Sequence, residues 1–129
     1  IARDVVEDSK NNRFYIQHDF QVIKNTLTLA DLFYKSSFTS IKKIPFNFRF
    51  AILVARRVYR KIGDEILKKK NIESYNEAGK VYLNNLGKLY QTVLSLSDLI
   101  RLLLTKEKKY HMIDEHLLIN EEIDLNERI

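Results

Sequence analysis

The chain has 129 residues, the length of one domain, and 45% of them are hydrophobic, which is enough to bury a sizeable core. The sequence has only three glycines and one proline, which favours a compact, mostly helical protein. It has no cysteine, which excludes a disulfide framework, a thiolate zinc site and a cysteine nucleophile. No apolar run approaches the roughly 18 residues of a membrane span and no signal peptide is readable, so we expect a cytoplasmic protein, with peripheral membrane association left open.

The net charge of +5 is unevenly distributed along the chain. From Asp114 to the end there are six acids and one base, so the positive charge lies in residues 1–113. A body this basic would attract nucleic acid, anionic lipid head groups or diphosphates. Because no nucleic-acid-binding motif is recognisable, we do not expect nucleic acid as a partner.

The first fifteen residues hold the densest group of side chains able to bind a metal and an anion together. If a helix runs through Asp8, then Asp4 and Asp8 are four residues apart and project from one face. Mg²⁺ takes oxygen ligands and is usually held by one or two carboxylates together with substrate phosphates. This pair therefore predicts a Mg²⁺ site, although a solvated helix with salt bridges would have a similar sequence.

Two arginines flank these acids. Arg3 stands beside Asp4, and Arg13 follows Asn11-Asn12, a pair that tolerates left-handed backbone geometry and should end the helix. Because guanidinium groups bind phosphate oxygens bidentately, Arg3 and Arg13 are candidate ligands for an anion held next to the metal.

Residues 25–40 carry apolar side chains at spacings typical of an amphipathic helix, with Thr26 or Thr28 as a candidate N-cap. Leu32, Phe33 and Tyr34 could form a wall against a substrate. Such residues are more often ordinary core, so this alternative stays open.

Pro45 is the clearest boundary, because proline fits the first turn of a helix. The helix that it opens should run to about Lys70, close to 38 Å if it has about 25 residues, and should be the central helix. Tyr59 lies within it and, judged by composition alone, is more simply explained as half-buried packing. We expect a buried apolar stripe along it, made of Phe50, Leu53, Val54, Val58 and Ile62.

After residue 70 we expect a polar break at residues 71–79 and then a helix over residues 81–104. Residues 106–129 are predicted to form a charged terminal helix and an acidic tail. His111 and His116 are five residues apart and so do not share a helical face, which makes a zinc site there improbable.

Two blocks of this sequence resemble segments of one known family. Arg3-Asp4-Val5-Val6-Glu7-Asp8, followed by Arg13-Phe14-Tyr15, resembles the second aspartate-rich motif of the squalene/phytoene synthase family, Arg-Asp-x-x-Glu-Asp and then Arg-x-Tyr. The block from Ile44-Pro45-Phe46 to Gly63 is similar to a later helix of bacterial phytoene and dehydrosqualene synthases. The blocks come in the family's order and at roughly its spacing, and the resemblance covers about the first seventy residues well.

The resemblance implies the all-α isoprenoid synthase fold, with residues 1–105 as the C-terminal portion of a synthase domain. Members of the family join two prenyl diphosphates, farnesyl or geranylgeranyl, head to head to give phytoene or a squalene-like hydrocarbon in carotenoid and isoprenoid biosynthesis. The implied roles are Mg²⁺ ligation by Asp4 and Asp8, diphosphate binding by Arg3 and Arg13, and catalytic positions lining the cavity for Tyr15 and Tyr59.

The sequence also departs from the family pattern. Asn12 stands where many members have glycine, Gln17 stands near a common proline, and no other Asp-x-x-x-Asp occurs between residues 9 and 129. We therefore expect roughly the first half of a synthase to be absent, the chain to be inactive by itself, and its exposed apolar wall to favour self-association. The alternative is a non-catalytic relative that serves as a binding or assembly module.

Overall fold

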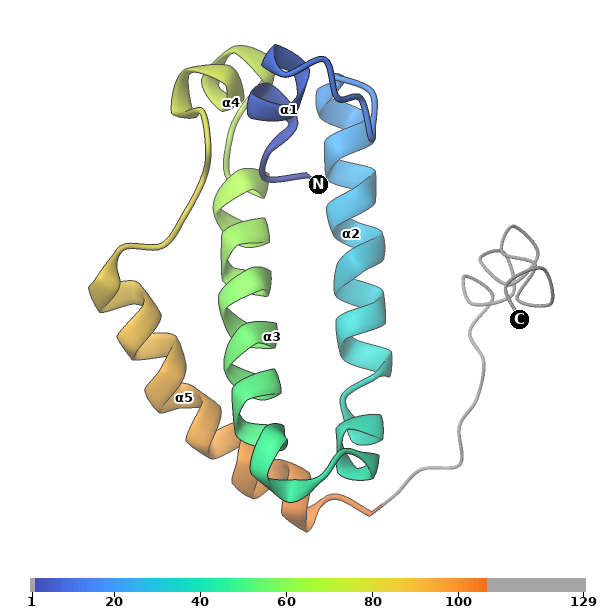
Figure 1. Cartoon of the computed structure of the whole chain (residues 1–129), viewed down its shortest axis with the longest axis vertical. Coiled ribbons are helices and arrows are strands. Elements are labelled where there is room, and N and C mark those ends of the chain that lie inside the picture. Colours follow the sequence, from blue (N-terminus) through green and yellow to red (C-terminus); the bar gives the residue numbers. More distant parts are fainter. Residues whose placement is uncertain (1, 107–129) are drawn as a thin grey trace, which may run out of the picture.

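The computed structural model describes residues 2–106, and this part of the chain is all-α, as predicted (Figure 1). None of its helices is long and apolar enough to cross a lipid bilayer. The predicted terminal helix and acidic tail, with His111 and His116, lie outside the described residues except for Lys106. The elements are α1 (Val5–Lys10), α2 (Phe20–Ser36), the 3₁₀ helix η1 (Thr39–Lys43), α3 (Phe46–Leu67), α4 (Ile72–Ala78) and α5 (Asn85–Leu104).

Helix α3 is central, as the sequence predicted. It begins directly after Pro45, which is its N-cap, and its 22 residues make it about 33 Å long. Helix α2 runs antiparallel beside it, α5 packs across it at an angle, and α1 and α4 lie together near its C-terminal end (Figure 1).

Helix α2 begins at Phe20, earlier than the predicted residue 25. Its N-cap is Asp19, whose carboxylate accepts a hydrogen bond of 2.9 Å from the backbone N–H of Val22. The predicted caps Thr26 and Thr28 are wrong: both hydroxyls donate, at 2.9 Å, to backbone carbonyls four residues earlier within the helix. The Asp19 cap gives a hydrogen-bond acceptor to a backbone N–H of the first turn that would otherwise be unpaired. The spacing of apolar residues does not indicate where such a cap lies.

The predicted break at residues 71–79 contains a helix, α4. Asn71 and Ser74 form a capping box, in which each side chain bonds to the other residue's backbone N–H. Gly79 ends the helix with φ of +58°, a conformation that glycine adopts without strain. Two well-placed caps thus stabilise a seven-residue helix in a segment that composition marks as polar.

Buried apolar side chains form two clusters at opposite ends of α3. The first holds α1 and α4 against α2 and α3 and includes Ala2, Val5, Ile23, Ile62, Ile66, Tyr75 and Leu83. The second joins η1, α3 and α5 through Ile41, Leu53 and Leu102. The predicted stripe is therefore right for Leu53 and Ile62, whereas Phe50, Val54 and Val58 are only partly buried because they line an open cavity.

Between these clusters, charged side chains join α3 to its neighbours. Arg57 donates to both carboxylate oxygens of Asp98 on α5, at 2.6 and 2.9 Å, and Arg60 donates to Asp31 on α2 at 2.6 Å. Burial, and then the charge of Arg60, lowers the pKa of Arg56, which lies in the same layer. The middle of the helical packing is therefore ionic.

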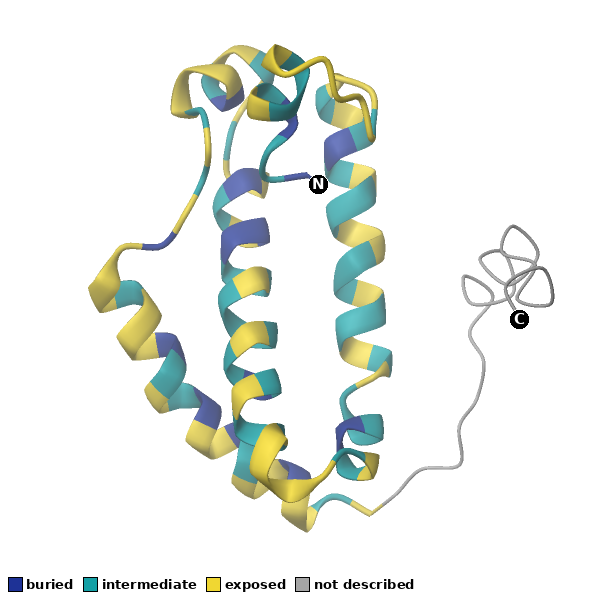
Figure 2. Ribbon diagram, viewed as in Figure 1, coloured by how far each residue is buried: buried dark blue, intermediate teal, exposed yellow. Residues whose placement is uncertain are grey.

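Helix α5 directs its polar face toward the rest of the fold and its apolar face outward. It begins at Asn85, after the cap Asn84, instead of at residue 81. Its inward face carries Gln91, Ser95 and Asp98, all buried, with Leu102. The apolar face is exposed (Figure 2).

Candidate functional site

Helix α1 places its acids one turn apart, as predicted. Asp4 is the N-cap residue, and the backbone N–H of Asp8 donates to its carbonyl at 2.8 Å. The hydroxyl of Tyr75, a fully buried residue of α4, donates to the carbonyl of Ala2 at 2.9 Å. The helix ends at Lys10, and Asn12 adopts the predicted left-handed conformation with φ of 54°.

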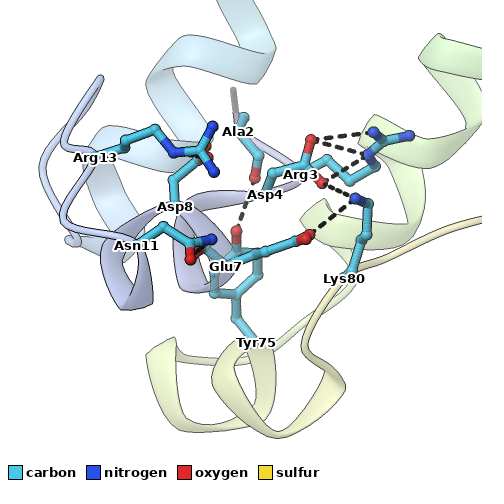
Figure 3. A network of polar contacts seen from close by, with 9 residues as sticks. All are labelled: Ala2, Arg3, Asp4, Glu7, Asp8, Asn11, Arg13, Tyr75 and Lys80. Atoms are coloured by element: carbon cyan, nitrogen blue, oxygen red, sulfur yellow. Dashed lines mark hydrogen bonds and ion pairs between the residues drawn. The ribbon is translucent and has the colours of Figure 1, made fainter.

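The Asp4 carboxylate lies between two cations (Figure 3). Arg3 donates to both of its oxygens, with Nε at 3.0 and 3.2 Å and Nη2 at 3.1 Å, and the Lys80 ammonium lies 3.4 Å away. Lys80 also contacts the Glu7 carboxylate at 2.8 Å. Burial alone raises the pKa of Asp4, but the hydrogen bond from Arg3 and the charges of Arg3 and Lys80 outweigh it, so the pKa lies below its usual value.

The Asp8 side chain pairs with a different cation, Arg13. Its carboxylate lies 4.0 Å from Nε of Arg13, and its backbone carbonyl accepts a 2.8 Å hydrogen bond from the Arg13 N–H. Figure 3 shows Asp8 directed toward Arg13 while Asp4 is directed toward Arg3 and Lys80. Arg13 and Tyr15 line a shallow hollow beside α1, and the Tyr15 side chain is largely exposed.

An open cavity of about 620 Å³ lies between α3 and the segment leading into α5. Its volume is within the range of pockets that bind small molecules. Arg3 and Tyr59 lie on its lining with apolar side chains of α3, chiefly Phe50, Val54, Val58 and Ile62. Neither Arg13 nor Tyr15 lines this cavity, so the structure brings together Arg3, Asp4 and Tyr59 but places Arg13 and Tyr15 around a separate hollow.

The donors of α1 have the chemistry that Mg²⁺ prefers, since they are carboxylate oxygens. In residues 2–106 there is, however, no group of three or more histidine, cysteine, aspartate or glutamate side chains that could hold a metal ion. A Mg²⁺ ion held by Asp4 or Asp8 would therefore have to take its remaining ligands from substrate phosphates and water.

Lys80 is the site residue that sequence reasoning missed. It lies just after the turn at Gly79 and reaches α1 because α4 packs against it. No spacing rule connects positions more than seventy residues apart. The only signal available was a lysine beside a glycine that ends a helix, which is too common to interpret.

Comparison with models of known protein families, with curated proteins and with solved structures finds no match to this chain.

Proposed function

We propose that this chain forms one wall, and one of two aspartate-rich motifs, of a Mg²⁺-dependent prenyltransferase site that joins two prenyl diphosphates head to head within an isoprenoid synthase fold. The observation that supports this best is the position of Arg3, which belongs both to the polar cluster of Asp4 and Lys80 and to the lining of the apolar cavity. A prenyl diphosphate needs this adjacency, because its anionic head is joined directly to a long apolar tail.

The head group would be held at the end of α1. Arg3 and Lys80 are cations that can donate to diphosphate oxygens, and they can exchange their contacts with Asp4 for the incoming anion. Asp4 and Asp8 would then be free to hold Mg²⁺. When bound, the metal would stabilise the negative charge that develops on the departing diphosphate.

The tail would lie along α3. Phe50, Val54 and Val58 give it an apolar surface and keep water from the reacting carbon. Tyr59, about half exposed, lines the same cavity, where the face of its ring can stabilise a carbocation. Asp8 would exchange its ion pair with Arg13 for the metal, and Tyr15 is a further aromatic residue in the loop that carries Arg13.

One carboxylate pair is not enough for turnover, because departure of the diphosphate needs metals anchored on both sides of the anion. We expect the chain alone to bind prenyl diphosphate without releasing hydrocarbon. An upstream half with a second Asp-x-x-x-Asp would supply the missing ligands.

The proposal is tested by calorimetric titration of the purified chain with farnesyl diphosphate, with and without millimolar Mg²⁺. We expect binding that Mg²⁺ strengthens, and a loss of about tenfold or more in Asp4→Asn. The matched control is Asp64→Asn, which removes an exposed carboxylate on another part of the helical surface. Equal affinities for the wild type, Asp4→Asn and Asp64→Asn would rule out the metal and diphosphate roles of α1.

A further inference from the structure

Helix α5 exposes a continuous apolar face. Its hydrophobic side chains on the outward face are each at least half exposed, although most residues of these types are buried in folded proteins (Figure 2). The exposed fractions are 75% for Leu86, 60% for Leu89, 61% for Tyr90, 56% for Val93, 51% for Leu96, 59% for Ile100, 51% for Leu103 and 80% for Leu104.

Six of these residues alternate at spacings of three and four. In a heptad they take the first and fourth positions in turn: Leu86, Leu89, Val93, Leu96, Ile100 and Leu103. This is the repeat by which two helices pack in a coiled coil. The first heptad position holds a β-branched residue twice, Val93 and Ile100. The fourth position of each heptad holds leucine, and this combination favours parallel two-stranded pairing.

The described residues, 2–106, leave this face of α5 exposed. We call the six heptad residues the stripe. Four other side chains of α5 are buried against the fold, and they occupy the heptad positions opposite the stripe: Gln91, Ser95, Asp98 and Leu102. Asp98 is fixed there by Arg57, so α5 cannot rotate to bury its leucines without breaking that ion pair. A second helix can therefore reach the stripe without meeting α3.

The stripe also has the size and charge that a copy of itself requires. The six stripe residues, together with Tyr90 and Leu104 beside them, each expose roughly 100 Å² and would bury on the order of 800 Å² per copy, which is the size of a standard stable interface. The positions that flank the stripe, Asn85, Tyr90, Thr92, Ser97, Leu99 and Leu104, carry no charge. The seam and the positions that flank it therefore bring no like charges together.

We propose that α5 pairs in parallel with α5 of a second copy of this chain, so that the leucine, valine and isoleucine stripe forms the seam of a homodimer. The pairing does not depend on the function proposed above. It identifies a surface for self-association that is separate from the cavity wall.

The test is sedimentation equilibrium of the full chain from micromolar to submillimolar concentration, comparing the wild type with Leu96→Lys. In a parallel seam two such lysines face each other, so we expect the dimer dissociation constant to rise by at least about tenfold. Leu32→Lys, at a 38% exposed position on α2, is the matched control and should leave the dimer unchanged. Circular dichroism checks that both variants keep their helices.

Cross-linking tests the parallel register, because the chain has no cysteine of its own. Under oxidising conditions Leu86→Cys should form a disulfide with its own copy in a parallel pair, since equivalent residues face each other. A wild type that is monomeric throughout, a dimer that Leu96→Lys and Leu32→Lys weaken equally, or cross-linking only between Leu86→Cys and Leu103→Cys would each overturn the proposal.

Discussion

Asp4 connects segments that are far apart in the sequence. Its carboxylate contacts Arg3 beside it and Lys80 beyond α4, and this arrangement fixes the end of α1 next to the cavity. The same two cations are those proposed to receive a diphosphate. One carboxylate can therefore stabilise the resting fold and also be displaced from its cations when an anion binds.

The lowered pKa of Asp4 leads to a pH prediction. Because the folded carboxyl ionises below its unfolded value of 3.8, its ion pairs stabilise the fold above that pH, and this contribution is lost as pH falls through the folded value. We expect Asp4→Asn to lower the free energy of unfolding at pH 7 and to show less loss of stability between pH 5 and about pH 3. Urea unfolding at each pH measures both effects. Asp64→Asn is the control, and a wild-type pH dependence in Asp4→Asn would contradict the assigned pairing.

At the scale of elements, the sequence predicted the helices whose limits are local. Pro45 opened α3, and Asn11-Asn12 ended α1, because both effects depend on backbone geometry at the residue itself. The missed features depend on partners. Asp19 capping α2 shows that a cap can precede the apolar pattern, and α5 shows that periodicity reveals an apolar face without revealing which neighbour covers it.

The orientation of α3 gives a prediction that separates two adjacent residues. Leu53 is fully buried in the second cluster, whereas Val54 lines the open cavity. We expect Leu53→Asp to cost more than about 4 kcal/mol, because an unpaired charge would enter the core, and Val54→Asp to cost clearly less. Thermal or urea unfolding followed by circular dichroism measures both. Equal stabilities for the two variants would show that the helix faces are wrongly assigned.

The ion pair between Arg57 of α3 and Asp98 of α5 gives a further prediction about stability. Asp98→Ala would leave Arg57, about three-quarters buried, without its carboxylate, and we expect a cost of about 3 kcal/mol. Replacing both partners, Arg57→Met with Asp98→Leu, should recover only part of this loss, because Arg56, whose Nη1 lies 3.9 Å from Asp98 and whose side chain is 11% exposed, also loses this carboxylate. Urea unfolding provides the measurement. An Asp98→Ala variant as stable as the wild type would mean that the pair does not hold α5 in place.

At the scale of the whole molecule, the all-α architecture followed from composition and periodicity, whereas the site could be predicted only in part. Asp4, Asp8 and Arg3 could be proposed as site residues because they lie close together in the sequence. The cavity beside them could not, since it forms only when α3 meets the segment leading into α5. Arg3, which donates to Asp4, lies on the lining of this cavity, an adjacency that sequence spacing could not supply.

The central claim is that the polar cluster on α1 and the apolar cavity on α3 form a single site. Competition measures this most directly, with fluorescent farnesyl diphosphate analogue bound to the chain in the presence of Mg²⁺ and displaced separately by inorganic diphosphate and by farnesol. We predict that each competitor displaces the analogue, the first from Arg3 and Lys80 and the second from the wall at Val54 and Val58. Displacement by only one competitor, or by neither, would show that the head and tail do not share one site.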